Sequence, residues 1–433
     1  MNTKSSDELT APLSYQQQEL LRQIREAPQC AAMFDNVYLY ELCGPVEIDC
    51  LAQAVRDVVQ RHAALRTTIG TLEGEDVQRI DPVVSDGILP VGSAETLDGL
   101  IADLSARRLQ SDAVSAGLPL FRAEAHRVGD RLLVSFSLHH LVSDGWSDAI
   151  LWRDLSECYA ARLDRRAPEL PPLTGSYAEF ARKQRRWWEE SRSTVVSFWE
   201  RELAGWTDDI AWSRIDPGAN ASYERDLEVL DLDPETVRRV RDTARTARVT
   251  PFIVLLAATA VGVSRLTGRH EVLLGSNVAG REDLSRLDAI GYFTNTRLTV
   301  ARIRPGEPLS ELVSSLRDHW FTGDQHRDAY IDQLSLALGR PGVVKVDMLD
   351  LPGTSDSPDS GLPAAPVLPG VEVKPVEVGS EDLHWRELHF NWVPVDGSYQ
   401  LELRYRPART ARETVIGARD RIAEVLHDLD GLM

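Results

Sequence analysis

Residues 120–138 carry the pattern that most restricts the fold of this chain, because they predict a β-hairpin with a defined end. Two segments, Leu120–Arg127 and Arg131–Leu138, flank the turn sequence Val128-Gly129-Asp130. In the second segment apolar residues alternate with serines, and successive side chains of a strand point to opposite faces of a sheet. The hairpin therefore places the residues after 138 at the end of a core strand. The alternating apolar positions are Leu132, Val134, Phe136 and Leu138.

Two histidines and a carboxylate follow this strand, in the sequence His139-His140-Leu141-Val142-Ser143-Asp144-Gly145. Because side chains alternate along a strand, only one of the two imidazoles can enter a given pocket. Parity predicts that His140 shares the apolar side of Phe136 and Leu138, where an imidazole stays neutral and can accept a proton. We expect His139 to be a hydrogen-bonded positioning group.

Asp144 and Gly145 complete the turn. A carboxylate at position 144 can hold the tautomer of an imidazole, or it can lock the turn through an arginine. Gly145 allows a backbone conformation, or a close approach by substrate, that a side chain would block. A helix predicted from about Ser147 to Ala161 begins beside the turn, and its N-terminal dipole favours negative charge there. The competing interpretation is a core strand that ends in hydrogen-bonded histidines and an Asp-Gly turn.

The chain is long enough for two lobes. Its 433 residues, 43% of them hydrophobic, exceed what one compact core accommodates. Pro168-Glu169-Leu170-Pro171-Pro172 lies in a predicted linker, so we place an N-terminal lobe at residues 1–175 and a C-terminal lobe at residues 176–433. In the second lobe, predicted strands and helices alternate, which indicates a mixed α/β architecture. The strands lie near 228–232 and 271–277, and the helices at 234–247 and 251–266.

Charge and cysteine spacing argue against several classes of protein. A formal net charge of −19 offers no basic footprint for nucleic acid. The longest apolar run, residues 252–263, is shorter than the roughly 20 residues of a membrane span, and residues 1–9 do not form a signal peptide. We therefore expect a cytoplasmic protein with no membrane partner. The cysteines have no CxxC or metal-ligand spacing, which predicts free thiols and no metal site. They are Cys30, Cys43, Cys50 and Cys158.

Several sequence blocks carry a resemblance to a known family. Residues 139–145 match HHxxxDG, and with this motif the chain resembles the condensation domains of nonribosomal peptide synthetases and related acyltransferases. The other blocks occur in the order typical of that family. Leu13–Glu19 is similar to its Ser-x-x-Gln segment, Arg61–Thr67 to RHxxLRT, Tyr177–Ala181 to YxDFA and Ile290–Thr296 to IGxFxNT.

This resemblance implies a fold and a reaction. The fold would be two chloramphenicol-acetyltransferase-like lobes in a V-shaped arrangement, each a mixed sheet flanked by helices, with the active site in a tunnel between them. The reaction would transfer an acyl or aminoacyl group from a carrier-protein thioester to an amine or hydroxyl, which forms an amide or an ester. The phosphopantetheine arm of an acyl or peptidyl carrier protein would deliver the donor, so no bound cofactor is expected. The acceptor would be a small molecule or carrier-bound.

The resemblance also assigns roles to residues. His140 would remove the acceptor proton or orient its lone pair, and the sequence does not separate these two roles. Arg281 would pair with Asp144 across the lobes as structural support, with Arg66 as the competing partner. Asn295 would contact substrate and help hold an oxyanion, or it would secure the lobe interface as a strand-end amide. Trp146, beside the motif, is assigned to substrate binding.

Other readings of the same sequence stay open. A noncatalytic domain that docks or recruits carrier proteins would keep this fold, and an epimerization-type domain would keep HHxxxDG but needs a glutamate that we cannot locate. The basic cluster Arg182–Arg186 is a candidate carrier-docking surface, although a solvated helix face is the simpler interpretation. With no adenylation signature or carrier-type serine motif recognised, we expect a free-standing, monomeric enzyme.

Overall fold

The computed structural model divides the chain into two compact units. Unit 1 comprises residues 1–187, 279–294 and 351–381, and unit 2 comprises residues 188–278, 295–350 and 382–433. The expected boundary at residue 175 thus lies inside unit 1, and two later segments of the chain also belong to that unit. The structure describes residues 9–84, 86–108, 114, 116–204, 222–322, 330–338, 344–348, 363–379, 383–384 and 386–429.

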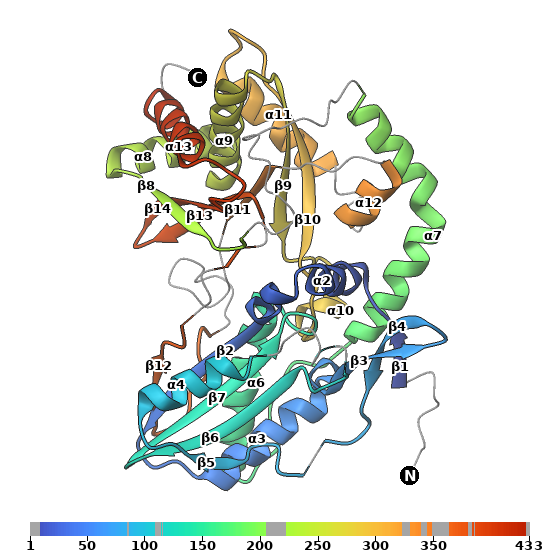
Figure 1. Ribbon diagram of the computed structural model, residues 1–433, viewed down its shortest axis with the longest axis vertical. Coiled ribbons are helices and arrows are strands. Elements are labelled where there is room, and N and C mark those ends of the chain that lie inside the picture. The colour runs from blue at the N-terminus through green and yellow to red at the C-terminus, as the bar shows by residue number, and fades with distance from the viewer. Residues whose placement is uncertain are drawn as a thin grey trace. The chain divides into compact units, whose positions relative to one another are not determined.

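A five-stranded sheet in the order β12-β2-β7-β6-β5 forms the centre of unit 1 (Figure 1). Strands β6 and β7 are antiparallel, with Phe121 opposite Leu138 and Val128 opposite Arg131, which confirms the predicted hairpin. Gly129 at the turn has a φ of 59°, a left-handed conformation that glycine adopts without strain. The strands are β2 (Asp35–Cys43), β5 (Val91–Ser93), β6 (Phe121–Val128), β7 (Arg131–His139) and β12 (Glu372–Val376).

Helices cover both faces of this sheet. Helix α6 (Gly145–Leu163) belongs to one apolar cluster together with alternate residues of β7, such as Phe136. Helix α4 (Leu97–Ala106) belongs to a second apolar cluster together with Leu133 of the same strand. Figure 1 shows α4 and α6 on opposite faces. Both faces of β7 are therefore buried. The remaining elements of unit 1 include α2 (Tyr15–Glu26), α3 (Ile48–Arg61), α10 (Leu284–Leu287), and the strands β1 (Thr10–Pro12), β3 (Thr67–Leu72) and β4 (Glu75–Ile80) of a three-stranded sheet.

Unit 2 is built on a six-stranded sheet in the order β10-β9-β11-β13-β14-β8. Strand β11 is parallel to both of its neighbours and the other pairs are antiparallel, so the sheet is mixed. Two mixed sheets flanked by helices confirm the predicted fold class. The strands are β8 (Asp226–Asp231), β9 (Glu271–Val278), β10 (Asn295–Arg302), β11 (Val344–Met348), β13 (Leu388–Val395) and β14 (Ser398–Tyr405).

Helices cover one face of the unit 2 sheet, where apolar strand residues such as Leu274, Phe390 and Trp392 form a core with them. The predicted helix starts at Pro234 and Pro251 are confirmed, and Asp233 caps the first of them. Helix α7 (Tyr177–Glu202) runs from unit 1 into unit 2. The helices of unit 2 are α8 (Pro234–Ala247), α9 (Pro251–Thr267), α11 (Leu309–Thr322), α12 (Ile331–Leu338) and α13 (Arg412–His427).

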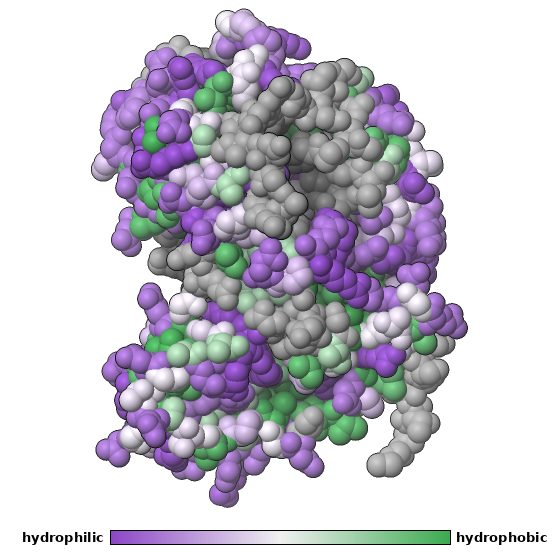
Figure 2. All heavy atoms as spheres, in the orientation of Figure 1, coloured by the Kyte–Doolittle hydropathy of each residue, from purple (hydrophilic) through white to green (hydrophobic). Residues whose placement is uncertain are grey.

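On the face shown in Figure 2, hydrophilic residues predominate among the described residues, with hydrophobic areas between them. Among the described residues, no single helix is long and apolar enough to cross a membrane. Only α8 and α9 taken together reach that length and hydropathy, and they are bent by 108° at the break between them.

The core of unit 1 centres on Trp152, which is 1% exposed. The rings of Tyr38, Tyr40 and Phe136 contact its indole edge-on, with centroid distances of 5.2, 5.4 and 5.2 Å. We predict that Trp152→Ala lowers the free energy of unfolding by about 3–5 kcal/mol, because the cavity cannot collapse between three rings. Urea unfolding followed by circular dichroism measures this change.

Leu284→Ala is the control for this prediction, because Leu284 belongs to the same unit and is 78% exposed. It should change the free energy of unfolding by less than about 0.5 kcal/mol. Equal unfolding midpoints for the two variants would contradict the packing assigned to Trp152.

Candidate functional site

His139 is the last residue of β7 and is fully buried. Its Nδ1 accepts the backbone N–H of Leu141 at 3.1 Å, so the neutral ring carries its proton on Nε2. Burial lowers the pKa of His139 to about 3, with smaller contributions from His140 and Arg122. This imidazole is therefore neutral at physiological pH, and its hydrogen bond holds the start of the turn.

His140 lies just beyond the strand and is half-buried. Its backbone N–H donates to the Phe34 carbonyl at 2.6 Å, and its Nδ1 donates to the Ser143 carbonyl at 2.7 Å. Because a carbonyl oxygen only accepts, Nδ1 must carry a proton, and the neutral ring has its lone pair on Nε2. The Tyr292 ring lies beside the imidazole, with centroids 4.4 Å apart and planes tilted by 43°. The turn thus presents one imidazole in a tautomer that can accept a proton.

The prediction that His140 shares the dry side of Phe136 and Leu138 is wrong. Strand β7 ends at His139, and the backbone N–H of His140 donates a hydrogen bond to the Phe34 carbonyl where a turn begins. In this turn side chains no longer alternate between the two faces of the sheet. Alternation also fails to mark exposure in this strand, since residues 133–139 are all buried. The fully desolvated imidazole is His139, and His140 is the accessible one.

Asp144 is buried and caps the N-terminus of α6. Its Oδ1 accepts hydrogen bonds from the backbone N–H of Ser147 at 2.9 Å, from the Ser147 hydroxyl at 2.7 Å and from Arg281 Nη2 at 2.9 Å. Its Oδ2 accepts from the backbone N–H groups of Phe293 at 2.9 Å and Thr294 at 3.2 Å. Although burial alone would raise the pKa of Asp144, the Arg281 charge and the Ser147 donors hold it below the ordinary value.

Arg281 is 4% exposed and pairs with Asp144, as the resemblance implied. The pairing was expected across the lobes, but both residues belong to unit 1. The guanidinium also donates to the carbonyls of Arg286 at 2.5 Å and Ala289 at 2.7 Å, and it lies 4.5 Å from the centroid of Phe293. Arg66, the competing partner, instead contacts the carbonyl groups of Val59, Gln60 and Asp81.

The structure places the other predicted site residues as follows. Gly145 is the first residue of α6, and its φ is not in the left-handed region, so no backbone strain explains the glycine. Trp146 is half-buried, and its Nε1 donates to the Leu287 carbonyl at 3.2 Å. Asn295 is buried at the start of β10, directly after Thr294, and belongs to unit 2, and its contact with substrate stays a prediction.

Two residues that organise the site were missed in the sequence. Ser147 contacts Asp144 and accepts the backbone N–H of Gly291 at 3.0 Å, and Tyr292 packs on His140. The spacing of Asp144 and Ser147 is typical of a helix cap and its third residue, so a capping signal was available. No such signal exists for Phe293, because its backbone N–H makes the contact, whereas Thr294 adds a hydroxyl donor to Asp144 Oδ2 at 3.4 Å.

The predicted basic docking cluster is partly engaged in the fold. Arg182 Nη2 donates to the Thr10 carbonyl at 2.5 Å, and Arg185 Nε donates to the Leu13 carbonyl at 2.9 Å. The Arg185 guanidinium also lies 4.4 Å from the centroid of the Tyr15 ring. These arginines hold the start of the chain against α7, and carrier docking at this face stays a prediction.

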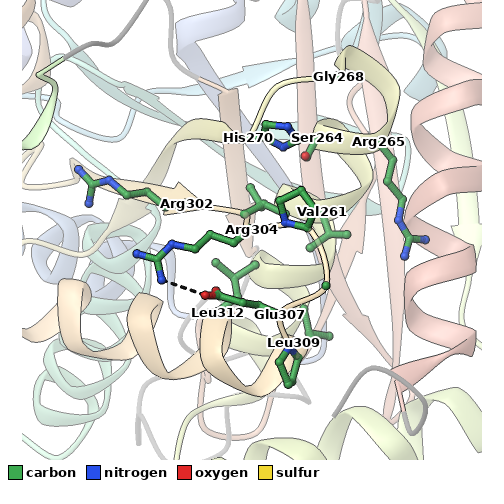
Figure 3. Close-up of a pocket in the computed structure, with 14 residues that line it drawn as sticks. Val261, Ser264, Arg265, Gly268, His270, Arg302, Arg304, Glu307, Leu309 and Leu312 are labelled. Atoms are coloured by element: carbon green, nitrogen blue, oxygen red, sulfur yellow. Dashed lines mark hydrogen bonds and ion pairs between the residues drawn. The ribbon is translucent and has the colours of Figure 1, made fainter.

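A pocket of about 590 Å³ lies in unit 2, where α9, the end of β10 and α11 meet (Figure 3). Arg265, Arg302 and Arg304 line it, and Arg304 is paired with Glu307 at 2.9 Å. None of the predicted site residues lines this pocket.

A second buried carboxylate, Asp148, lies one helical turn after Asp144. The Tyr38 hydroxyl donates to its Oδ2 at 2.5 Å, and its Oδ1 has no partner among the described residues. Burial raises the pKa of Asp148 to about 7. The hydrogen bond from Tyr38 lowers this pKa, and the negative charge of Asp144 raises it. Arg281 is already paired with Asp144, so the first turn of α6 holds two carboxylates and one compensating arginine.

We predict that Arg281→Leu lowers the free energy of unfolding by about 3–5 kcal/mol, because it leaves the Asp144 charge buried and unpaired. The double variant Arg281→Leu, Asp144→Asn should recover part of this loss, as measured in a double-mutant cycle by chemical unfolding. The contribution of Asp144 is present above the unfolded-state pKa of about 3.9 and is lost as the pH falls through the lowered folded-state pKa.

Arg245→Leu is the matched control for this prediction, since Arg245 pairs with Asp242 at 2.8 Å on an exposed helix face. That variant should lose less than about 1 kcal/mol. Equal losses for Arg245→Leu and Arg281→Leu would contradict the role of the buried pair.

A separate prediction concerns Asp148. A carboxyl group whose pKa is raised in the folded state binds its proton more tightly there, so the stability of the protein should fall as the pH rises from about 4 to about 7. Asp148→Asn removes this group and keeps an acceptor for Tyr38. The variant should therefore be more stable than the original protein at pH about 8, and the difference should vanish below pH about 4. Unfolding curves across this range test the prediction, and a constant difference between the two proteins would refute it.

Comparison with known proteins identifies the family of this chain. The model of the condensation domain family matches residues 8–429. A linear gramicidin synthase of Brevibacillus parabrevis is 30% identical over 338 residues, which are 76% of this chain and 6% of that protein. Phosphinothricin tripeptide synthetase PhsB of Streptomyces viridochromogenes is 32% identical over 318 residues, which are 71% of this chain and 26% of that protein. The chain thus spans a small part of the curated relatives that it matches.

Solved structures show the same fold. The X-domain from teicoplanin biosynthesis superposes with a TM-score of 0.80 at 21% identity, covering 100% of this chain and 97% of that one. The first condensation domain of the CDA synthetase superposes with a TM-score of 0.72 at 17% identity, covering 98% and 97%. Because the family model matches residues 8–429, and the histidine turn and its Asp144–Arg281 pair are in place, this chain belongs to the condensation domain family.

Proposed function

We propose that this chain transfers an acyl or aminoacyl group from the phosphopantetheine thioester of a carrier protein to an amine or hydroxyl acceptor. The acceptor atom attacks the thioester carbonyl carbon, the carbon–sulfur bond breaks, and the acceptor proton passes to His140 Nε2. The departing thiolate then takes up a proton and leaves as a free thiol. The phosphopantetheine arm belongs to the carrier protein, so the proposal needs no cofactor bound to this chain.

The tautomer of His140 carries this proposal. The 2.7 Å hydrogen bond from Nδ1 to the Ser143 carbonyl leaves Nε2 as the acceptor, and the ring is only half-buried. His139 cannot replace it in this role, since its Nδ1 already accepts from Leu141 and its Nε2 is buried. Membership of the condensation domain family supports the reaction class, and the relatives that it matches include peptide and depsipeptide synthetases.

A noncatalytic docking domain is the second candidate. A complex of the X-domain and OxyB from teicoplanin biosynthesis superposes on this chain with a TM-score of 0.78, at 21% identity. At that identity the likeness shows the fold alone. A domain that only docks other proteins has no need of an imidazole held in the acceptor tautomer, so the geometry of His140 favours catalysis.

The test is thiol release from a panel of aminoacyl carrier proteins, with and without amine or alcohol acceptors. We expect release to depend on the acceptor, and His140→Ala to lower kcat/KM by about 10²-fold to 10⁴-fold, the usual contribution of a general base. His270→Gln is the control, because His270 is exposed in unit 2 and takes no part in the histidine turn.

Each other outcome has a defined meaning. Release without acceptor would indicate a hydrolase. No release with any member of the panel would favour the docking domain. Turnover by His140→Ala at the original rate would remove the proposed base.

A further inference from the structure

Tyr292 is a half-buried residue in a segment of unit 1 that is otherwise buried from 289 to 293. Its position is open in the pattern IGxFxNT that residues 290–296 resemble, so the resemblance gives this side chain no role. Its ring packs on the imidazole of His140, with centroids 4.4 Å apart and planes tilted by 43°. His140 also belongs to unit 1 and is half-buried, so the two rings lie side by side within one unit.

The backbone before Tyr292 is closely packed and hydrogen-bonded. The Gly291 N–H donates to the Ser147 hydroxyl oxygen at 3.0 Å, and Ser147 is buried in the first turn of α6. A Cβ atom at position 291 would lie 2.2 Å from Cδ2 of the Tyr177 ring, closer than side-chain atoms approach one another. Glycine therefore lets the main chain pass directly against Tyr177.

The backbone at Tyr292 and after it is held as well. The Tyr292 carbonyl accepts a hydrogen bond from the Tyr177 hydroxyl at 2.8 Å. The next two N–H groups, those of Phe293 and Thr294, donate to Asp144 Oδ2 at 2.9 and 3.2 Å. All of these residues belong to unit 1. With hydrogen bonds on both sides, the main chain fixes the point from which the Tyr292 side chain projects.

The imidazole of His140 needs more than its hydrogen bond to hold one orientation. Among the described residues, its ring atoms make one hydrogen bond, from Nδ1 to the Ser143 carbonyl at 2.7 Å. This bond sets the tautomer, but a ring held at one atom can still swing about the bond and turn the Nε2 lone pair away. The Tyr292 ring occupies the space on one side of the imidazole and blocks a swing toward that side.

We propose that Tyr292 is a positioning residue for His140, because its ring holds the imidazole in the orientation in which Nε2 takes the acceptor proton. This role rests on the transfer reaction proposed above. Tyr292 acts through His140 and takes up no proton itself. Orientation matters for such a step, since a misplacement of about 1 Å can lower a rate by about 10²-fold.

Two variants separate the ring from the hydroxyl, with a thioester and acceptor that the original protein turns over. Tyr292→Leu keeps apolar bulk without a ring. It should lower kcat by about 10-fold to 10²-fold and leave KM nearly unchanged, because the lost contact concerns the base and not substrate binding. Tyr292→Phe keeps the ring and should keep the original kcat.

Tyr223→Leu is the matched control. Tyr223 is also half-buried, but it belongs to unit 2, where the Arg406 guanidinium lies 3.8 Å from the centroid of its ring. This variant should keep the original kcat and KM.

A double-mutant cycle shows through which residue Tyr292 acts. If its ring positions His140, Tyr292→Leu should have no further effect on the residual rate of His140→Ala, in which the base is already absent. A general role in folding or in substrate binding would lower the rate by the same factor in both backgrounds.

NMR of the full chain with labelled histidine and tyrosine rings tests the contact without turnover. In the original protein we expect nuclear Overhauser contacts between the rings of Tyr292 and His140, and His140 ring protons displaced by the ring current of the tyrosine. The displacement should persist in Tyr292→Phe and disappear in Tyr292→Leu. His140→Ala assigns the resonances.

Three results would overturn the positioning role alone. They are turnover by Tyr292→Leu at the original kcat, equal losses in both backgrounds of the cycle, and an original protein in which the two rings show no contact. The last result does not require any variant to fold. A failure of the original protein to turn over any thioester would instead overturn the reaction proposed for His140, and the positioning role with it.

Discussion

The site depends on one buried carboxylate. Asp144 has to be ionised inside unit 1, and an ion in that position is tolerated only when charge and hydrogen bonds replace the water it loses. Arg281 supplies the charge, and the remaining donors come from Ser147 and from the backbone of Phe293 and Thr294. These partners lie at the N-terminus of α6 and in the segment 279–294, which are far apart in the sequence. The carboxylate thereby joins the helix that follows the histidine turn to the segment that carries Tyr292.

In a catalytic triad one carboxylate both holds the imidazole tautomer and fixes the position of the ring. Here two different groups perform these tasks. Asp144 does not contact an imidazole, and the tautomer of His140 is set by a backbone carbonyl inside its own turn. The carboxylate acts on His140 only through structure, because it holds the backbone of Phe293 and Thr294, directly after Tyr292, whose ring packs on the imidazole. In unit 2 the opposite solution occurs, since Asp347 holds His389 directly. In each histidine one ring nitrogen is thus held by a hydrogen bond, to a backbone carbonyl in His140 and to a carboxylate in His389.

Local signals predicted much of this fold. The hairpin followed from alternation and a glycine turn, and helices α8 and α9 followed from their prolines, because these features act within a few residues. The family blocks added the pairing of Asp144 with Arg281. Three features were beyond such reasoning. Strand β7 is buried on both faces, and one of these faces is covered by α4. The alternation of apolar and polar residues therefore did not show which side chains are buried, and His140 was wrongly predicted to be desolvated. The membership of residues 279–294 in unit 1 is a tertiary property. The N–H donors of Phe293 and Thr294 are backbone groups, which any residue except proline would supply.

The need to compensate buried charge also determines the charge balance at the start of α6. Asp144 and Asp148 are four residues apart in the first turn, and a single arginine compensates them. Arg281 donates directly to Asp144, so that carboxylate is ionised first and its charge then opposes ionisation of the second. Because the pKa of Asp148 is about 7, the pair and its arginine are neutral in mild acid and carry one negative charge in mild base. The electrostatic environment of the turn that holds His140 therefore changes within the pH range in which an imidazole base has to work. The cause is Asp148, whose side chain hydrogen-bonds to Tyr38 rather than to the imidazole.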